Sequence, residues 1–237
     1  RGLVPPGLMG AHEVQEVKHI VQELVDQASQ YAHPTPGEVE VDVEVEGRRL
    51  QGNVTRIHGK SLLRVRFSNH SLTHVFGAWL DLLAVTLAQP DQAWQAVVIG
   101  QDKTQARTTV ITSPGEDKAR VYLHQLLDLY HRGICEPLPL PPKTAAEWAR
   151  VARNHQPLTG AKRAEAFREA GKVWSPSYPP GSGENHDPYH VWMWAGEVEL
   201  AEVVATPAPP QEQWVDEPSR FGQLALRMWE GLHDHLV

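Results

Sequence analysis

The amino-acid sequence predicts an α/β (α+β) fold in which helices flank a mixed sheet. Residues 38–46 alternate strictly between acidic residues and valine, which is the period of a half-buried strand. Two short strand-like runs follow, each after a turn signal, at Gly47 and at His58-Gly59-Lys60. Apolar residues at helical spacing lie on both sides of this region, in residues 12–31 and 72–88. Strands enclosed by helices in this way are typical of a layered α/β domain.

The first half of the chain supplies the elements of this sheet. The helix at 12–31 should end before His33-Pro34, because proline disfavours helical geometry in the residue before it. We expect strands at 38–46, 49–57 and 61–67, a helix at 72–88, strands at 97–100 and 108–112, and a helix from 113 to 134. Ser113, followed by Pro114 and Glu116, is a suitable N-cap for that last helix.

The second half of the sequence contains proline-rich segments between helical patterns, and it predicts a helical extension. Glu136–Pro142 is rich in proline, and we interpret it as a stiff connector lying on its own domain rather than as a recognition strip for a partner. We expect helices at 143–154, 159–171 and 219–235, a loop at 175–188, and a surface segment at 207–218. Trp148, Trp192 and Trp194 are expected in the core.

Composition restricts the class of protein. The 237 residues are 41% hydrophobic and include eight tryptophans, which indicates a globular chain. No apolar run is long enough for a membrane span, so no membrane association is expected. Cys135 is the single cysteine; it fits a reducing, cytoplasmic location and is expected as a packed thiol. Arg1 in place of Met, with Pro5, Pro6 and Gly7 close behind, suggests a piece of a longer polypeptide.

Charge is distributed unevenly along the chain. Residues 47–80 contain no Asp or Glu, whereas the whole chain has a net charge of −7. The six basic residues of this stretch are Arg48, Arg49, Arg56, Lys60, Arg64 and Arg66. The rest of the chain therefore carries −13, which argues against general nucleic-acid binding. The six basic residues are nevertheless candidate contacts with DNA phosphates.

Four stretches of the sequence carry a family resemblance. They are Arg1–Gly7; Glu38–Arg66; Leu126–Tyr130 with Gly133, Pro137–Leu140, Lys143-Thr144 and Trp148; and Gly183-Glu184 with Asp187–Tyr189 and Trp194. Together they resemble the C-terminal domain of the bacterial RecC family, the gamma subunit of exodeoxyribonuclease V (the RecBCD complex). The resemblance implies a non-catalytic part of a helicase-nuclease for double-strand break repair and recombination. Its implied partners are the subunits RecB and RecD, with double-stranded and unwound DNA.

The same resemblance implies a restriction-endonuclease-like, or PD-(D/E)XK nuclease-like, core at 1–135. Residues 136–237 would form the proline-rich connector and helical extension, packed on the same domain. An active nuclease of this fold needs an Asp on the second strand and an acid with a Lys two residues later on the third, where they bind Mg²⁺ and assist hydrolysis. This chain has Thr55 on the second strand and either Arg64 with Arg66 or Val65 with Phe67 on the third. We therefore expect a catalytically inactive core with no catalytic residue, metal site or cofactor.

Two other functions remain open at this point. The chain could be an active Mg²⁺ nuclease that uses unexpected acids such as Asp42 or Glu44, or a protein-interaction module without DNA contact. The acidic face of strand 38–46 is most simply a solvated or edge face, or a partner for Arg64 and Arg66 if the strands are neighbours. His186, Asp187 and His190 are closely spaced, but we interpret them as loop residues, because a zinc site needs a third or fourth ligand.

Overall fold

The computed structural model describes residues 7–155 and 157–237 of the chain. The first resembling stretch, Arg1–Gly7, therefore lies outside the described residues except for Gly7. The chain divides into two compact units, of which the first extends to Leu123 and includes His235–Val237. The second unit comprises His124–Asp234. The units are described separately below, and the prediction that the extension packs on the core stays a prediction.

The first unit contains a five-stranded mixed sheet with strands in the order β1-β2-β3-β4-β5. Only the β3–β4 pair is parallel, because α2 carries the chain across the sheet between them. The elements are α1 (Leu8–Ser29), β1 (Gly37–Val45), β2 (Arg48–His58), β3 (Ser61–Asn69), α2 (Leu72–Ala88), β4 (Gln95–Asp102) and β5 (Gln105–Thr112). The predicted α/β architecture with a mixed sheet is confirmed.

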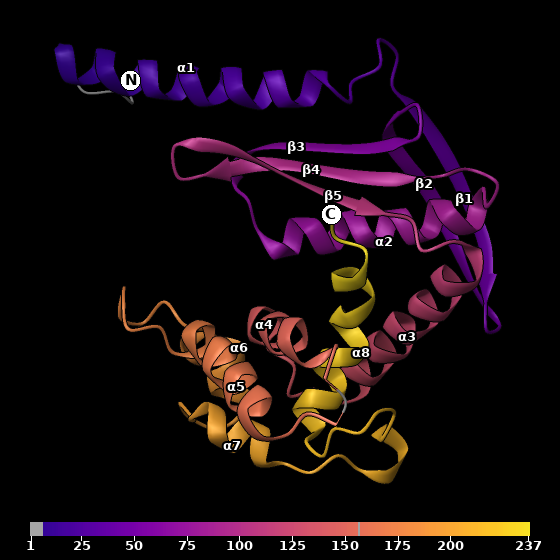
Figure 1. Ribbon diagram of the computed structural model, residues 1–237, viewed down its shortest axis with the longest axis vertical. Helices are drawn as coiled ribbons and strands as arrows, with labels where there is room; N and C mark the ends of the chain where they lie inside the picture. The colour runs from indigo at the N-terminus through magenta and orange to yellow at the C-terminus, as the bar shows by residue number, and fades with distance from the viewer. Residues whose placement is uncertain (1–6, 156) are drawn as a thin grey trace. The chain divides into compact units, whose positions relative to one another are not determined.

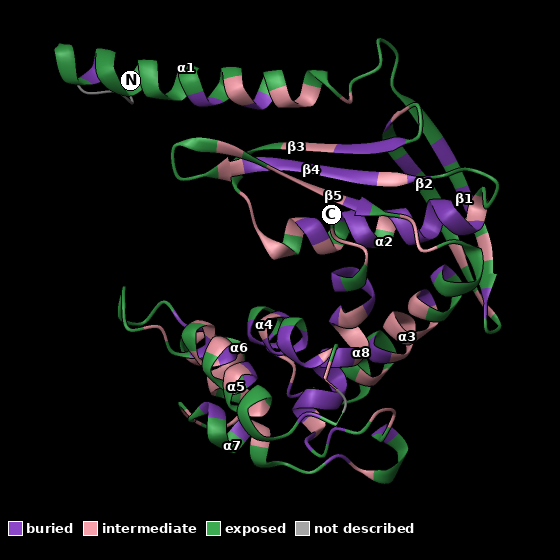
Figure 2. Ribbon diagram, viewed as in Figure 1, coloured by how far each residue is buried: buried purple, intermediate pink, exposed green. Residues whose placement is uncertain are grey.

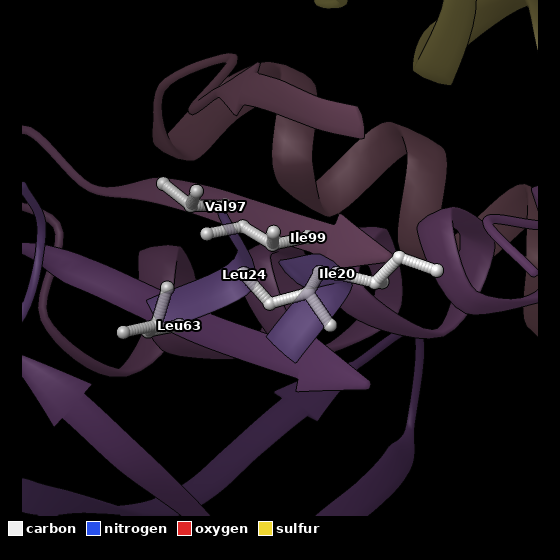
Figure 3. Close-up of a cluster of buried hydrophobic side chains, with 5 residues drawn as sticks. All are labelled: Ile20, Leu24, Leu63, Val97 and Ile99. Atoms are coloured by element: carbon white, nitrogen blue, oxygen red, sulfur yellow. The ribbon is translucent and has the colours of Figure 1, made fainter. Parts of the chain in front are cut away.

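Helices lie on both faces of strands β3–β5 (Figure 1). On the α1 side, Ile20 and Leu24 pack on Leu63, Val97 and Ile99, all buried (Figure 3). α2 lies on the opposite face, and its N-cap Ser71 accepts a hydrogen bond from the His74 amide. The sheet is thus the middle layer of the first unit.

The outer part of α1 is less buried than its pattern suggests. Of the apolar residues at helical spacing, Ile20 and Leu24 are buried. Four valines of the same pattern are more than a third exposed, namely Val14, Val17, Val21 and Val25. Figure 2 shows the exposed character of this helix. The helical period was therefore predicted correctly, but only part of the apolar surface contributes to the core.

β1 and β2 form a long antiparallel hairpin whose two faces differ. Glu46 and Gly47 make a two-residue turn with φ values of 48° and 74°, which is the left-handed geometry of a type I′ turn. Val39, Val41 and Val45 are buried, whereas the acidic side chains between them are on the outer face. β1 is an edge strand of the sheet, as its charged face suggested.

The sheet opens between β2 and β3. Only Ile57↔Leu62 and His58↔Ser61 are paired in the described strands, although β2 has 11 residues. Arg56 lies just before this point with φ 60°, a conformation that interrupts regular strand geometry. Because β2 separates β1 from β3, these two strands are not neighbours, and the condition for pairing the acidic face with Arg64 and Arg66 is not met.

α3 (Glu116–Cys135) ends close to the predicted position but differs from the prediction at its start and in the burial of Cys135. It begins at Glu116, and Ser113 instead accepts a hydrogen bond from the Gly115 amide at 3.2 Å, so the expected cap is wrong. Cys135 is exposed rather than packed. In the described residues no helix has both the length and the apolar character needed to cross a membrane.

The second unit is helical. It contains the end of α3, then α4 (Pro142–Ala152), α5 (Gly160–Trp174), η1 (Glu184–His186), α6 (Pro188–Met193), α7 (Leu200–Ala205), η2 (Pro210–Glu212) and α8 (Arg220–Asp234). The short helices α6 and α7 were not predicted, because their six residues each give too little periodicity to recognise. α4 packs against both α5 and α8, and seven of its 11 residues are buried.

Large aromatic side chains fill the second unit. Trp148 of α4 is fully buried and packs edge-on against Phe221 of α8, with ring centroids 5.5 Å apart. Trp194 packs against the buried Trp174 in the same way. Trp192, however, is 78% exposed, so its expected place in the core is wrong. The segment 207–218 is likewise only partly on the surface, because it includes the buried side chains of Glu212 and Glu217.

Candidate functional site

β2 and β3 diverge beyond their two paired positions, and Arg64 of β3 lies next to this opening. In this chain the side chain of Arg64 extends from β3 across the gap. Its Nη2 donates to the Asp81 carboxylate of α2 at 2.7 Å, and its Nη1 donates to the Thr55 carbonyl oxygen of β2 at 2.8 Å. The Arg64 side chain is only 17% exposed. A guanidinium therefore joins two strands and a helix through hydrogen bonds in a half-buried position.

The other positions at which an active nuclease would need acids or a lysine are Thr55, Val65 and Phe67. Thr55 contributes its backbone oxygen to the arginine, and no carboxylate from the acid-free stretch is available at this point. Val65 faces the opposite side of the sheet and packs on the cluster beneath α1. Phe67 is 53% exposed. Asp81, the first acid after the stretch, forms an ion pair with Arg64 at 2.7 Å.

Two of the other candidate basic residues lie on opposite faces of the β1–β2 hairpin. Arg48 pairs with Val45 on the apolar face, where it is half-buried and its Nη1 atom has no hydrogen-bond partner among the described residues. Arg49 lies on the acidic face and donates two hydrogen bonds, at 2.7 and 2.6 Å, to the carboxylate of Asp42. These bonds lower the pKa of Asp42, so the pair stays ionised at neutral pH.

Three basic residues remain on the surface without a competing charge. Arg56, Lys60 and Arg66 are exposed, and their side chains make no ion pair with another described residue. Arg56 and Lys60 are both close to the point where β2 meets β3. Arg66 lies four residues beyond Leu62, which is about 13 Å along an extended strand. The six predicted residues thus do not form one continuous basic surface.

The acidic residues do not assemble into an alternative centre. Asp42 is held by Arg49, and the carbonyl oxygen of Glu44 accepts a hydrogen bond from Arg120 at 2.8 Å. Across the described residues, no three His, Cys, Asp or Glu side chains come close enough to hold a metal ion. His186 instead lies beside Glu197, with its Nδ1 atom 3.0 Å from a carboxylate oxygen of Glu197. His186 and His190 lie in η1 and α6 rather than in an extended loop.

Two of the stretches that carry the family resemblance, Lys143-Thr144 and Gly183-Glu184, are in contact at the start of α4. Glu184 is 9% exposed, and its two carboxylate oxygens accept hydrogen bonds from the Lys143 and Thr144 amides at 3.0 and 2.7 Å. A helix N-terminus favours a negative charge here, because its first amides lack intrahelical partners. A Cβ at Gly183 would collide with the Trp174 carbonyl oxygen, so only glycine fits there. Gly183-Glu184 and Lys143-Thr144 could both be read from the sequence. Their contact could not be predicted, because about 40 residues separate them along the chain.

Buried charge pairs hold the rest of the second unit together. Glu212 is 1% exposed and receives hydrogen bonds from Arg220 at 2.7 and 3.0 Å and from Arg132 at 3.3 Å. The hydrogen bonds that Arg220 donates to Glu212, and secondarily to Glu136, raise the pKa of Arg220 above its usual range. Glu217 similarly accepts from Arg163 and from Ser219. Sequence reasoning missed these pairs, since their members are separated by up to 84 residues.

These features define the class of protein. The chain is an α/β domain built on a five-stranded mixed sheet, continued by a helical unit with a buried ionic core. The family model of the RecC C-terminal domain matches residues 1–153. The chain therefore belongs to the RecC C-terminal domain family.

Curated relatives agree with this assignment. The chain is 32% identical over 235 residues to the RecBCD enzyme subunit RecC of Mycobacterium tuberculosis (strain CDC 1551 / Oshkosh), over 97% of this chain and 20% of that protein. It is 30% identical over 230 residues to the RecBCD enzyme subunit RecC of Mycolicibacterium smegmatis, with the same coverage of both chains. The chain thus spans about a fifth of the length of these relatives.

Proposed function

We propose that this chain is the nuclease-like, catalytically inactive C-terminal domain of a RecC subunit, which holds partner subunits and guides DNA in a helicase-nuclease. The observation that carries the proposal is the position of Arg64 between Thr55 and Asp81. In a nuclease of this fold, acids on β2 and β3 and a lysine would serve a metal ion at that position. Here the guanidinium itself joins β2, β3 and α2, so a structural ion pair takes the place of the reaction centre.

The element order supports the nuclease-like part of the proposal. A helix, a three-strand meander, a crossover helix and a parallel strand follow one another as α1, β1–β3, α2 and β4. Helices cover both faces of strands β3–β5 (Figure 1). This order matches the one expected for a restriction-endonuclease-like core. A partner role is supported by the relatives, which are subunits of the RecBCD enzyme, and we assign RecB-like and RecD-like subunits and a cytoplasmic location to the same proposal.

The DNA-guiding role rests on the exposed residues Arg56, Lys60 and Arg66, because Arg64 and Arg49 already have carboxylate partners. Each phosphate contact releases counterions, so binding should weaken as the salt concentration rises. A protein-interaction module without DNA contact is the second candidate. It is favoured by the division of the basic residues between faces and partners.

Charge reversal separates these two functions. In the full-length subunit assembled with its partners, we expect Arg56→Glu, Lys60→Glu and Arg66→Glu together to weaken DNA binding and to reduce the salt slope by roughly 2 to 3 units. Lys118→Glu is the matched control, because Lys118 is also exposed in the first unit and lies on α3. Unchanged DNA affinity and salt slope in the triple variant would reject DNA guiding and leave the interaction module.

The inactivity of the domain needs a separate assay. We expect the purified chain to leave linear DNA intact with Mg²⁺, because neither Asp42 nor Glu44 belongs to a metal-binding cluster among the described residues. Degradation that disappears in Asp42→Asn or Glu44→Gln would establish an active nuclease instead. Degradation that persists in both variants would come from a contaminating enzyme.

A further inference from the structure

The short helix α6 presents two large aromatic side chains to solvent. Tyr189 is 82% exposed and Trp192 is 78% exposed. They are three residues apart, so they lie on the same side of the helix. The other described tryptophans are less exposed than Trp192. Trp194 and Trp214 are half-buried, and five more are at most 5% exposed, namely Trp79, Trp94, Trp148, Trp174 and Trp229. We call Tyr189 and Trp192 the α6 aromatic pair.

The opposite side of α6 holds the pair in a fixed position. Trp194 and His190 pack on the buried Trp174 with ring centroids 5.5 and 6.0 Å away, and Trp174 Nε1 donates to the Val198 carbonyl at 3.0 Å. Asp187 caps the helix by accepting from the Tyr189 amide at 2.9 Å. An exposed aromatic residue on such a supported element loses little conformational entropy on binding, which is the property of an interface anchor.

The charge around the pair indicates what it can bind. Residues 173–219 contain eight Asp and Glu and no Lys or Arg. Three of these carboxylates are buried, namely Glu184, Glu212 and Glu217. Close to α6 in the sequence, Asp187 is half-buried and Glu197 and Glu199 are exposed. Nucleic-acid phosphates would be repelled here, although bases stack well on aromatic rings, because residues 173–219 contain no Lys or Arg and the exposed Glu197 has only the imidazole of His186 beside it among the described residues.

We propose that the α6 aromatic pair is a docking site for a partner protein whose surface has an apolar pocket bordered by Lys or Arg. The aromatic rings would enter the pocket, and the basic border would face Glu197, Glu199 and the aromatic faces themselves. Tyrosine and tryptophan are the residues most enriched among the dominant contacts of protein interfaces. The proposal rests on the function proposed above, since it takes the partner subunits of that assembly as the source of the basic surface.

The test measures assembly of the full-length subunit with its purified partner subunits, in parallel with DNA binding by the assembled complex. We expect Trp192→Ser to weaken assembly at least tenfold and Tyr189→Ser several-fold. Trp192→Lys should weaken it more than Trp192→Ser, because it adds a positive charge opposite the basic border. Tyr130→Ser is the matched control, since Tyr130 is a 64% exposed tyrosine outside the segment, and it should change assembly less than twofold.

A second measurement does not depend on the aromatic substitutions. Glu197→Gln should weaken assembly several-fold at low salt and have no effect at high salt, because screening removes the attraction. Thermal unfolding of each variant should match the wild type, because the replaced side chains are exposed.

Four results would overturn the proposal. Trp192→Ser assembling as well as the wild type would do so directly. Normal assembly with weakened DNA binding would assign the pair to nucleic acid, and loss of a wild-type homodimer would assign it to a second copy of the chain. A wild-type subunit that does not assemble at all would also reject the partner role proposed above. The DNA-guiding role fails separately, through the arginine and lysine variants alone.

Discussion

Two stretches of the molecule have opposite charge, and they differ in whether their charged side chains are buried or exposed. Residues 47–80 of the first unit have six basic residues and no acid, whereas residues 173–219 of the second unit have eight acids and no Lys or Arg. In the second unit, three of the acids are buried and receive hydrogen bonds from arginines or from backbone amides. In the first unit, three of the basic residues remain on the surface without a described ion pair.

The difference shows that the charge of a stretch does not determine where its side chains lie. A charged side chain can be buried when an opposite charge comes from elsewhere in the fold. Arg132, Arg163 and Arg220 supply this charge to the acids of the second unit. Among the described residues, the basic residues of the acid-free stretch form ion pairs only with Asp42 and Asp81, one on either side of the stretch.

The largest effect should come from the buried carboxylates of the second unit. We expect Glu212→Gln to destabilise the chain by about 3 kcal/mol, because Arg220 and Arg132 would lose the charge that offsets their partial burial. Urea unfolding measures this loss. Asp216→Asn is the control, since Asp216 is exposed in the same segment and should change stability by less than about 0.5 kcal/mol. An equal effect of both substitutions would remove the distinction between the buried and exposed acids.

A smaller effect is expected at the start of α4. Glu184→Gln keeps one hydrogen-bond acceptor but leaves either the Lys143 or the Thr144 amide without its partner. Together with the lost charge at the helix N-terminus, this should destabilise the chain by about 2 kcal/mol. The same urea titration measures it, and hydrogen exchange of the Thr144 amide should become faster. A wild-type exchange rate at Thr144 would show that the carboxylate does not hold this helix.

The smallest of the three effects belongs to the first unit. Arg64→Met keeps a long apolar side chain but removes the bonds to Asp81 and Thr55, and should destabilise the chain by about 1 kcal/mol. The loss is limited because the Asp81 side chain is 39% exposed and can be hydrated by water. Arg66→Met, at an exposed position two residues along β3, should have almost no effect. Equal stability of the two variants in urea would show that Arg64 is not a structural residue.

The sheet was predicted well because its signals are local. Alternation in β1, turn residues after β1 and β2, and the apolar stripe of α2 each depend on neighbours in the sequence, and the structure places α2 at Leu72–Ala88 as expected. The course of segment 207–218 and the exposure of Trp192 depend on distant partners. The burial of Glu212, for example, requires Arg132 and Arg220, and no local pattern connects these residues.

The candidate site was predicted only in part for the same reason. The absence of acids near Thr55, Arg64 and Arg66 could be read directly from the sequence. The Arg64–Asp81 bond could not, because it depends on the packing of α2 on the sheet. The distribution of the six basic residues over different faces could not be predicted either. It depends on the register of the β1–β2 hairpin and on the opening between β2 and β3.

That opening also affects how the chain behaves when it is alone. In a hairpin with a two-residue turn, alternate residues of β2 direct their backbone groups away from β1, and here these are Arg49, Gln51, Asn53 and Thr55. Arg64 covers the carbonyl of Thr55, but no described strand pairs with the other three residues. Such an edge can add a strand from another molecule. The isolated chain should therefore self-associate slowly at high concentration, through intermolecular β-structure along β2, and a proline in place of Gln51 should suppress it.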